Sequence, residues 1–375
     1  MLKNRWLMLA MITVDAAVAL AQAPTPVIRP VVSVSPVEVH ADRTVTFRVW
    51  APRASAVGVM GDFPPVPGPE AHLMTKDERG VWTVTLGPFP SNIWTYNFLI
   101  DGVQLPWELF DVPSDQPQFY SVRAVPHGTV HQARYHSKSL GVERTVYVYT
   151  PPGYPQSTTR YPVLYLLHPA GGTGAPYWTV VGQANVILDN LIADGRAKAM
   201  VVVMPFGYPR ESDRDRFGQR RESVQDHKGF EADLLGDLIP FVERSYRVSA
   251  DAGQRAIAGA SMGGLQALTI GVAHLETFGW IAGFSALGGL GPDAQLATVF
   301  APLLIDPAQS NKRIRLLWFA VGDQEKRLMI RNQEFSTLLT QHGIRHTFAP
   351  TPGWAHQVQL WRQNLHDFAR LLFSR

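Results

Sequence analysis

The hydrophobic pattern of this chain changes near residue 125, and this change limits its fold more than any other feature. On the N-terminal side, apolar and polar residues alternate in short segments, as they do in strands with one buried face. On the C-terminal side, strand-like segments are apolar throughout and are separated by segments with helical spacing. Apolar strands that alternate with helices are typical of a mostly parallel sheet covered on both faces. The sequence therefore predicts a doubly wound α/β domain preceded by a small all-β immunoglobulin-like sandwich.

The predicted elements can be assigned to residue ranges. The alternating strands are residues 44–50, 56–60, 80–86 and 93–100. The apolar strands are residues 146–149, 163–167, 200–204, 256–258, 281–284 and 314–321. The helices are residues 184–194, 230–246, a segment that begins at Met262, 332–342 and 360–373. Residues 113–118 are rich in proline and glutamine and form the expected linker, so we predict a sandwich at 24–122 and an α/β domain at 123–375.

The first residues have the composition of an export signal. Lys3 and Arg5 precede the apolar run Trp6–Val14, and Ala21-Gln22-Ala23 matches an A-x-A cleavage site. The run is too short to span a bilayer, and no stretch of about 20 apolar residues follows it. We therefore expect a cleaved signal peptide at residues 1–23, a periplasmic or extracellular location, and no membrane partner.

Composition excludes several classes of protein. The chain has no cysteine, which excludes a disulfide scaffold, a thiolate metal site and a cysteine nucleophile. The formal net charge of +3 is not accompanied by a block of Lys and Arg, which argues against a nucleic-acid partner. His127, His131 and His136 lie close together, but their spacing fits neither one helix face nor one strand face. We expect neither a metal ion nor another cofactor.

The strongest chemical signal is Gly259-Ala260-Ser261-Met262-Gly263, a G-x-S-x-G motif. It lies between a predicted strand and a predicted helix, which is the context in which this motif carries a nucleophilic serine. Such a sharp turn strains the serine backbone, and the glycines let neighbouring chain pass close to it. The hydroxyl is then presented at a helix N-terminus, where N–H groups stabilise a developing oxyanion. We therefore predict that Ser261 is a nucleophile rather than part of a glycine-rich turn that serves only packing.

In this architecture an acid and then a histidine follow the serine along the chain. The histidines after Ser261 are His274, His342, His346, His356 and His366. His356 lies in a loop directly before the last predicted helix, where a catalytic base is expected. The acid is expected after the strand that ends at Val321, and both Asp323 and Glu325 are available there.

An oxyanion hole requires two backbone donors. The N–H of Met262, directly after the predicted nucleophile, is one candidate. The N–H of Ala170 is the other, because it lies in a glycine-containing loop after the strand at residues 163–167, and Pro169 beside it has no N–H to donate. Slightly downstream, Tyr177 and Trp178 are either walls of the pocket or core residues.

These segments resemble a known family. Residues 163–168, 184–192 and 255–264 are similar to the esterase D-like α/β-hydrolases, and more narrowly to the feruloyl and acetylxylan carbohydrate esterases and their enterochelin-esterase-like relatives. The similarity runs from about Pro126 to beyond Trp361. The region before it resembles the early-set, carbohydrate-binding-module-like sandwich that precedes many such esterases.

The chain departs from the family pattern at three positions. Pro169 replaces the first glycine of the usual H-G-x-G, which is compatible with donation by the next residue. The family acid is usually an aspartate three residues after a glycine, which favours Glu325, whereas a one-residue insertion nearby would favour Asp323. Val358 occupies a position, two residues after His356, where the family often has tryptophan.

The resemblance implies a secreted serine esterase that removes feruloyl or acetyl groups from plant cell-wall polysaccharide. The alternatives are a periplasmic siderophore esterase of the enterochelin type and a carbohydrate-binding protein with a weakened hydrolase domain. In the sandwich, we expect Trp50 and Trp82 in the core and Trp94 and Trp107 to be freer to contact sugar. None of the four is assigned to a binding site.

Overall fold

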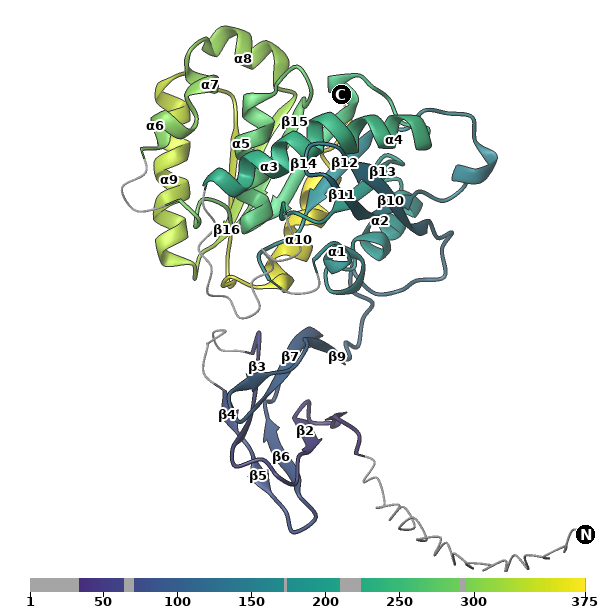
Figure 1. Cartoon of the computed structure of the whole chain (residues 1–375), viewed down its shortest axis with the longest axis vertical. Coiled ribbons are helices and arrows are strands. Elements are labelled where there is room, and N and C mark those ends of the chain that lie inside the picture. Colours follow the sequence, from purple (N-terminus) through teal and green to yellow (C-terminus); the bar gives the residue numbers. More distant parts are fainter. Residues whose placement is uncertain (1–33, 64–70, 172–173, 210–223, 291–294, 375) are drawn as a thin grey trace, which may run out of the picture.

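The computed structural model describes residues 34–63, 71–171, 174–209, 224–290 and 295–374 (Figure 1). The expected signal peptide lies outside these ranges. Within them, no helix is long and apolar enough to cross a membrane. The described chain forms an all-β sandwich followed by an α/β domain, which confirms the predicted fold class (Figure 1).

The sandwich consists of two antiparallel sheets. One sheet has the order β1-β2-β6-β5, and the other has the order β4-β3-β7-β8 with β9 paired to β7. The strands are β1 (Val37–Val39), β2 (Val45–Trp50), β3 (Val57–Gly61), β4 (His72–Leu73), β5 (Thr75–Lys76), β6 (Val81–Leu86), β7 (Asn92–Ile100), β8 (Val103–Gln104) and β9 (Glu108–Val112). Alternate residues point inward, and Phe47, Phe63 and Phe110 pack their rings against one another in the core.

The α/β domain is built on an eight-stranded mixed sheet with the order β10-β11-β13-β12-β14-β15-β16-β17. The strands are β10 (Thr129–Ser137), β11 (Val142–Thr150), β12 (Val163–Leu167), β13 (Val201–Pro205), β14 (Arg255–Ala260), β15 (Trp280–Phe284), β16 (Leu316–Gly322) and β17 (Thr347–Thr351). The pairs β10–β11 and β11–β13 are antiparallel, and the strands from β13 to β17 are parallel. The carboxyl ends of the parallel strands therefore meet at one edge, where α/β proteins place their sites.

Helices cover both faces of this sheet. They are α1 (Tyr177–Val180), α2 (Ala184–Ala193), α3 (Val224–Asp233), α4 (Ile239–Ser245), α5 (Met262–Ala273), α6 (Leu296–Val299), α7 (Ala301–Leu304), α8 (Pro307–Arg313), α9 (Lys326–Gln341) and α10 (Val358–Ala369). Along β12, Val163, Tyr165 and Leu167 join a core with α4, α5 and α9. Leu164 and Leu166 join a second core with α1, α2 and α10. Strands buried on both faces explain why they are apolar at every position.

Several predicted elements begin or end at other residues. The helix predicted at 230–246 begins at Val224 and contains one π-helical turn at Leu234–Leu238 between α3 and α4. The helix predicted at 332–342 begins six residues earlier, at Lys326. The residues of its first turns, 326–331, are exposed or only partly buried, so no buried apolar face marked them in the sequence. Strand β10 was not predicted, because its sequence, TVHQARYHS, is mostly polar and exposed.

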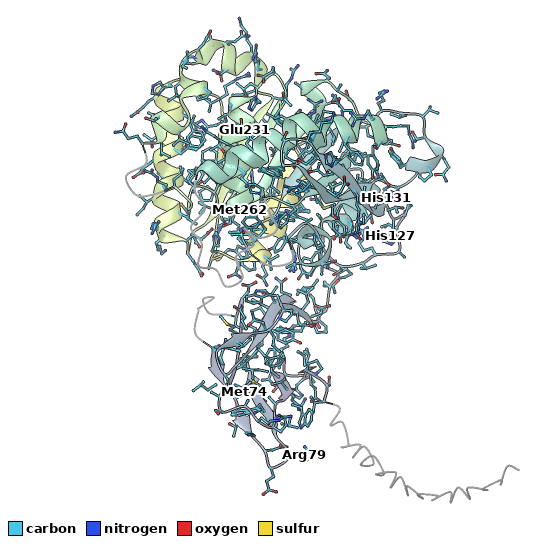
Figure 2. All side chains as sticks on the ribbon, in the orientation of Figure 1. Met74, Arg79, His127, His131, Glu231 and Met262 are labelled. Atoms are coloured by element: carbon cyan, nitrogen blue, oxygen red, sulfur yellow. The ribbon has the colours of Figure 1, made fainter. Side chains whose placement is uncertain are left out.

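The sandwich lies against the α/β domain at the ends of β3, β7 and β9, near α1 and α10 (Figure 1). Ile93 and Leu109 of the sandwich pack against the core that contains α10. The Gln359 side chain donates to the Ile93 carbonyl at 3.0 Å. Figure 2 shows Met262 in the half of the α/β domain nearer to the sandwich, and Arg79 at the far tip of the sandwich.

Candidate active site

Ser261 lies on the sharp turn between β14 and α5. Its backbone has φ 52° and ψ −112°, a conformation that residues with a side chain rarely adopt. Its N–H donates to the Phe284 carbonyl of β15 at 2.8 Å, which fixes the turn at the carboxyl edge of the sheet. The serine is partly exposed, whereas Met262 directly after it is buried. The turn thus directs the Ser261 side chain out of the sheet.

Gly263 makes this turn possible because the end of β12 passes close to it. A Cβ atom on Gly263 would lie 2.6 Å from the carbonyl group of Leu167 and 2.7 Å from the carbonyl oxygen of His168. Both contacts involve backbone, which cannot rotate away. The second glycine of the motif therefore sets the distance between Ser261 and the loop that follows β12.

His356 connects Ser261 to a buried carboxylate. Its Nε2 atom lies 2.9 Å from Ser261 Oγ, and its Nδ1 atom lies 2.6 Å from Glu325 Oε1. The His356 side chain is 43% exposed, so it borders solvent, while the Glu325 side chain is 2% exposed. With its Nδ1–H donated to Glu325, the ring presents Nε2 as an acceptor to the serine hydroxyl. The structure thus brings together three of the predicted site residues.

Asp323 has a different position. Its Oδ1 atom accepts from the Gly353 N–H at 2.9 Å, and its own N–H donates to the Thr351 carbonyl at 3.1 Å. These bonds fasten the end of β16 to the loop that carries His356. Of the two candidate acids, Glu325 is the one hydrogen-bonded to the histidine.

The two predicted oxyanion donors border the same turn. Met262 is the first residue of α5, and Ala170 is exposed in the loop after β12. Within the described residues, neither N–H has a hydrogen-bond acceptor. The Ala170 loop is held by its neighbours, since Gly171 N–H donates to the Tyr208 hydroxyl at 3.0 Å and Gly207 N–H donates to His168 Nε2 at 2.9 Å. Unoccupied N–H groups on an anchored loop can bind a negatively charged oxygen without rearrangement.

Sequence reasoning missed two residues that hold the Glu325 carboxylate. Its Oε2 atom accepts from the Ser285 hydroxyl at 2.8 Å and from the Gly322 N–H at 2.7 Å. The Trp361 indole N–H donates to Ser285 Oγ at 2.9 Å, and the indole ring packs edge-on against the His356 ring at 5.0 Å. Ser285 directly follows β15 at the carboxyl edge of the sheet, so its place after an apolar strand was a usable signal.

Trp178, which the sequence left as either a pocket wall or a core residue, belongs to the core. It is fully buried and donates to the Leu167 carbonyl at 2.9 Å.

Two tryptophan expectations for the sandwich were wrong. Trp94 is 2% exposed because its ring packs on Phe89, whereas Trp50, at the end of β2, is 39% exposed. Trp82 is buried as expected.

The three N-terminal histidines of the α/β domain lie apart from this site and have separate partners. Nδ1 of His127 lies 3.0 Å from Asp189, Nε2 of His131 lies 3.0 Å from the Thr150 hydroxyl, and Nδ1 of His136 lies 2.9 Å from Glu143. Among the described residues, no group of three possible ligands is placed to hold a metal ion.

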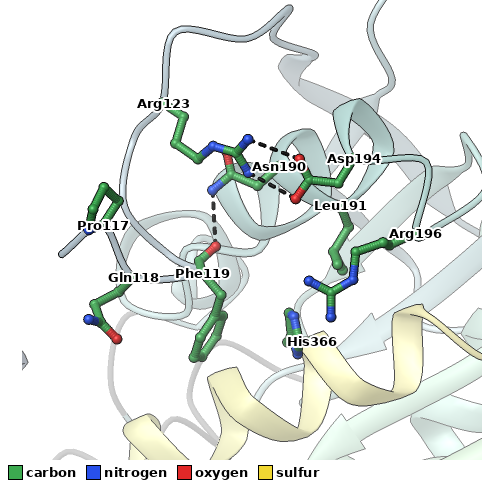
Figure 3. A pocket seen from close by; sticks show the side chains of 9 residues that line it. All are labelled: Pro117, Gln118, Phe119, Arg123, Asn190, Leu191, Asp194, Arg196 and His366. Atoms are coloured by element: carbon green, nitrogen blue, oxygen red, sulfur yellow. Dashed lines mark hydrogen bonds and ion pairs between the residues drawn. The ribbon is translucent and has the colours of Figure 1, made fainter.

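A pocket of about 380 Å³ lies elsewhere, beside the linker (Figure 3). The Arg123 guanidinium makes two hydrogen bonds of 2.9 Å to the Asp194 carboxylate there, and the Asn190 amide donates to the Phe119 carbonyl at 3.0 Å. The polar groups of this pocket thus fasten the linker to α2. None of the predicted site residues lines it.

A mostly parallel sheet with a serine on a strand-to-helix turn, and a histidine and a carboxylate in reach of it, defines the α/β-hydrolase class. The sequence pattern of the Esterase family matches residues 137–371, and that of carbohydrate-binding module 48, the isoamylase N-terminal domain, matches residues 36–116. The chain therefore belongs to the Esterase family.

Relatives and solved structures agree with this assignment. An endo-1,4-beta-xylanase/feruloyl esterase of Xylanibacter ruminicola is 32% identical over 356 residues, which cover 90% of this chain and 46% of the relative. An esterase of Mycobacterium tuberculosis is 28% identical over 59% of this chain and 54% of its own length. The chain thus spans about half the length of the curated relatives it matches.

Among solved structures, a ferulic acid esterase superposes with a TM-score of 0.54 at 26% identity, over 65% of this chain and 99% of that one. The enterobactin esterase of Shigella flexneri superposes with a TM-score of 0.62 over 88% of this chain and 92% of its own. At 18% identity, the second likeness shows a shared fold alone.

Proposed function

We propose that this protein is an exported serine carboxylic-ester hydrolase that removes feruloyl or acetyl groups from plant cell-wall polysaccharide. The observation that carries the proposal is the hydrogen-bonded series Ser261 Oγ, His356 and Glu325, with distances of 2.9 and 2.6 Å. The substrate class is supported by the relative whose name includes both xylanase and feruloyl esterase. Export is supported by the composition of residues 1–23, and we assign the sandwich to residues 24–122 and the esterase domain to residues 123–375.

In the proposed mechanism, Ser261 Oγ attacks the ester carbonyl carbon while His356 Nε2 accepts the hydroxyl proton. The carbonyl oxygen becomes an oxyanion that accepts hydrogen bonds from the N–H groups of Met262 and Ala170. The C–O bond to the alcohol then breaks, and His356 returns the proton to the departing alcohol. Water, deprotonated by His356, attacks the carbonyl carbon of the acyl-serine. The bond from this carbon to Ser261 Oγ then breaks, His356 returns the proton to Oγ, and the carboxylic acid is released. Glu325 accepts from Nδ1 throughout and stabilises the imidazolium.

Ser261→Ala tests this mechanism. Hydrolysis of p-nitrophenyl acetate and of methyl ferulate should fall by about a thousandfold or more in kcat/KM, because the nucleophile is removed. The melting temperature should change little, since the hydroxyl is partly exposed. A variant that folds normally and retains its activity would exclude Ser261 as the nucleophile.

The two alternative functions predict different observations. A carbohydrate-binding protein with a weakened hydrolase would be favoured if no acid reached His356, and the 2.6 Å contact of Glu325 argues against it. A siderophore esterase would hydrolyse a catecholate trilactone and leave methyl ferulate and acetylated xylan intact. Assaying the purified protein on these three esters therefore decides between the substrate classes.

A further inference from the structure

One carboxyl group of the sandwich interacts electrostatically with residues around His356. Asp62 directly follows β3, and its charge interacts with those of Arg362 and His356. It also interacts with the Tyr177 hydroxyl of α1. Burial raises the pKa of the Asp62 carboxyl, and the hydrogen bond from Thr95 opposes that shift. An acidic side chain in such a position is costly unless it has a structural partner or a ligand.

The sandwich is built to hold Asp62 in this place. The Thr95 hydroxyl of β7 donates to Asp62 Oδ2 at 2.5 Å, and the Asp62 N–H donates to the Thr95 carbonyl at 3.3 Å. The preceding residue is Gly61, where a Cβ atom would lie 2.2 Å from that same carbonyl oxygen. The end of β3 can therefore press against β7 only with glycine at this position.

The same strand β7 is fastened to the helix that follows the catalytic histidine. The Arg362 guanidinium of α10 is fully buried and donates to the Asn92 side chain at 3.1 Å and to the Ile93 carbonyl at 3.0 Å. Trp361 beside it packs on the rings of both His356 and Tyr177, at 5.0 and 6.3 Å. Tyr177 and His356 thus flank one aromatic side chain, next to the arginine that binds β7.

Among the described residues, each of the two polar groups has an atom without a hydrogen-bond partner. Oδ2 of Asp62 is occupied by Thr95, but across the described part of the chain Oδ1 accepts no hydrogen bond. The Tyr177 hydroxyl likewise has no hydrogen-bond partner among the residues that the structure describes. Burial, and then the nearby Asp62 carboxylate, raise the pKa of Tyr177 well above its ordinary value, so its hydroxyl stays protonated and can donate. An acceptor and a donor that interact electrostatically with each other match the two hydrogen-bonding capacities of one hydroxyl group.

We propose that Asp62 and Tyr177 bind a hydroxyl group of the substrate, so that the β-sandwich takes part in substrate selection by the esterase site. The inference rests on the proposed ester hydrolysis at Ser261. The hydroxyl belongs either to a phenolic acyl group or to the sugar that carries the ester. Both sources offer the same chemistry, and paired substrates distinguish them.

The test compares kcat/KM for two pairs of esters in Asp62→Ala and Tyr177→Phe. Methyl 4-hydroxycinnamate and methyl cinnamate differ by one acyl hydroxyl, and feruloyl-arabinose and methyl ferulate differ by the sugar. Within one pair, kcat/KM for the ester with the additional hydroxyl or sugar should fall by about tenfold relative to kcat/KM for its partner, because one hydrogen bond to that group is lost. A fall in the first pair identifies the phenol, and a fall in the second identifies the sugar. Because a ratio does not depend on the fraction of active enzyme, partial misfolding does not affect it.

Asp111→Ala is the matched control. Asp111 also lies in the sandwich and interacts with Arg362, and burial also raises the pKa of its carboxyl, but its charge does not act on His356. Its substitution should leave both ratios unchanged. Asp62→Asn keeps the side-chain shape and serves if the alanine variant does not fold.

Two kinds of failure can be told apart. Unchanged ratios in the Asp62 and Tyr177 variants, or equal changes in the Asp111 variant, would overturn this inference while the wild-type activity stands. A wild-type protein that hydrolyses none of the four esters nor p-nitrophenyl acetate would overturn the proposed function, and this inference with it.

Discussion

At the scale of single residues, the two oxygens of the Glu325 carboxylate have different hydrogen-bond partners. Oε1 accepts from His356, while Oε2 accepts from Ser285 and from the backbone of Gly322. Three hydrogen bonds fix the plane of the carboxylate, so the histidine ring has one favoured orientation. In the proposed mechanism, a buried carboxylate in contact with the ring also stabilises the positive charge that forms when His356 takes a proton.

Glu325→Gln should therefore reduce kcat by about 10³- to 10⁴-fold, because an amide neither carries the charge nor fixes the correct tautomer. The control variant is Asp323→Asn, which also removes one negative charge, two residues before Glu325. Asp323 only fastens the loop at Gly353, so its variant should keep kcat within about tenfold. Steady-state kinetics on p-nitrophenyl acetate measure both. A larger loss in the Asp323 variant would reverse the assignment of the acid.

Ser285→Ala should lower kcat about tenfold with little change in KM, because it removes one of the bonds that orient Glu325 and the acceptor of the Trp361 indole. Ser310→Ala is a matched control, since Ser310 is equally buried but donates to the Leu303 carbonyl at 3.1 Å, away from the site. The control should lower the melting temperature and leave kcat intact. If both variants lost kcat equally, Ser285 would have no specific role.

At the scale of elements, the strand-to-helix turn depends on a close backbone approach. Gly263→Ala would push Leu167 and His168 away, at a cost of about 1–3 kcal/mol, and would move the Ala170 loop. We expect a melting temperature several degrees lower and a loss of esterase activity. Gly236→Ala is the control, because its Cβ would make one ordinary contact of 3.4 Å. Thermal unfolding and activity of the control should match the wild type.

The same turn explains which parts of the site could be read from the sequence. Ser261 and the loop position of His356 follow from local patterns, because a strand, a glycine turn and a helix are contiguous in the chain. The choice between Asp323 and Glu325 is not local, since it depends on which side chain points from the end of β16 toward a loop 31 residues later. Asp62 had no signal, because its electrostatic interaction with His356 arises from the contact between two domains.

At the scale of the whole molecule, Arg362 joins the two domains. Its guanidinium donates to the Val181 carbonyl on one side, at 2.8 and 3.1 Å, and to Asn92 and Ile93 on the other. Burial lowers the pKa of Arg362 to about 10, so the group remains charged at neutral pH, and its bonds are charge-assisted. The buried cation therefore links the position of the sandwich to the helix that follows His356.

Replacing this residue tests whether the domains unfold together. Arg362→Met keeps the apolar stem but removes both guanidinium donors to the Val181 carbonyl and one of the two side-chain donors to the Ile93 carbonyl, which should cost about 2–4 kcal/mol. We expect the calorimetric transition to shift to lower temperature and to separate into two, one for each domain.

Arg370→Met is the control, because Arg370 follows the same helix, is half-exposed and makes one 4.0 Å ion pair with Asp367. Its transition should stay within about 0.5 kcal/mol of the wild type. A single, unshifted transition in the Arg362 variant would show that the apolar contacts of Ile93 and Leu109 are enough to hold the sandwich in place. In that case the position of Asp62 relative to His356 would depend on those apolar contacts rather than on the buried cation.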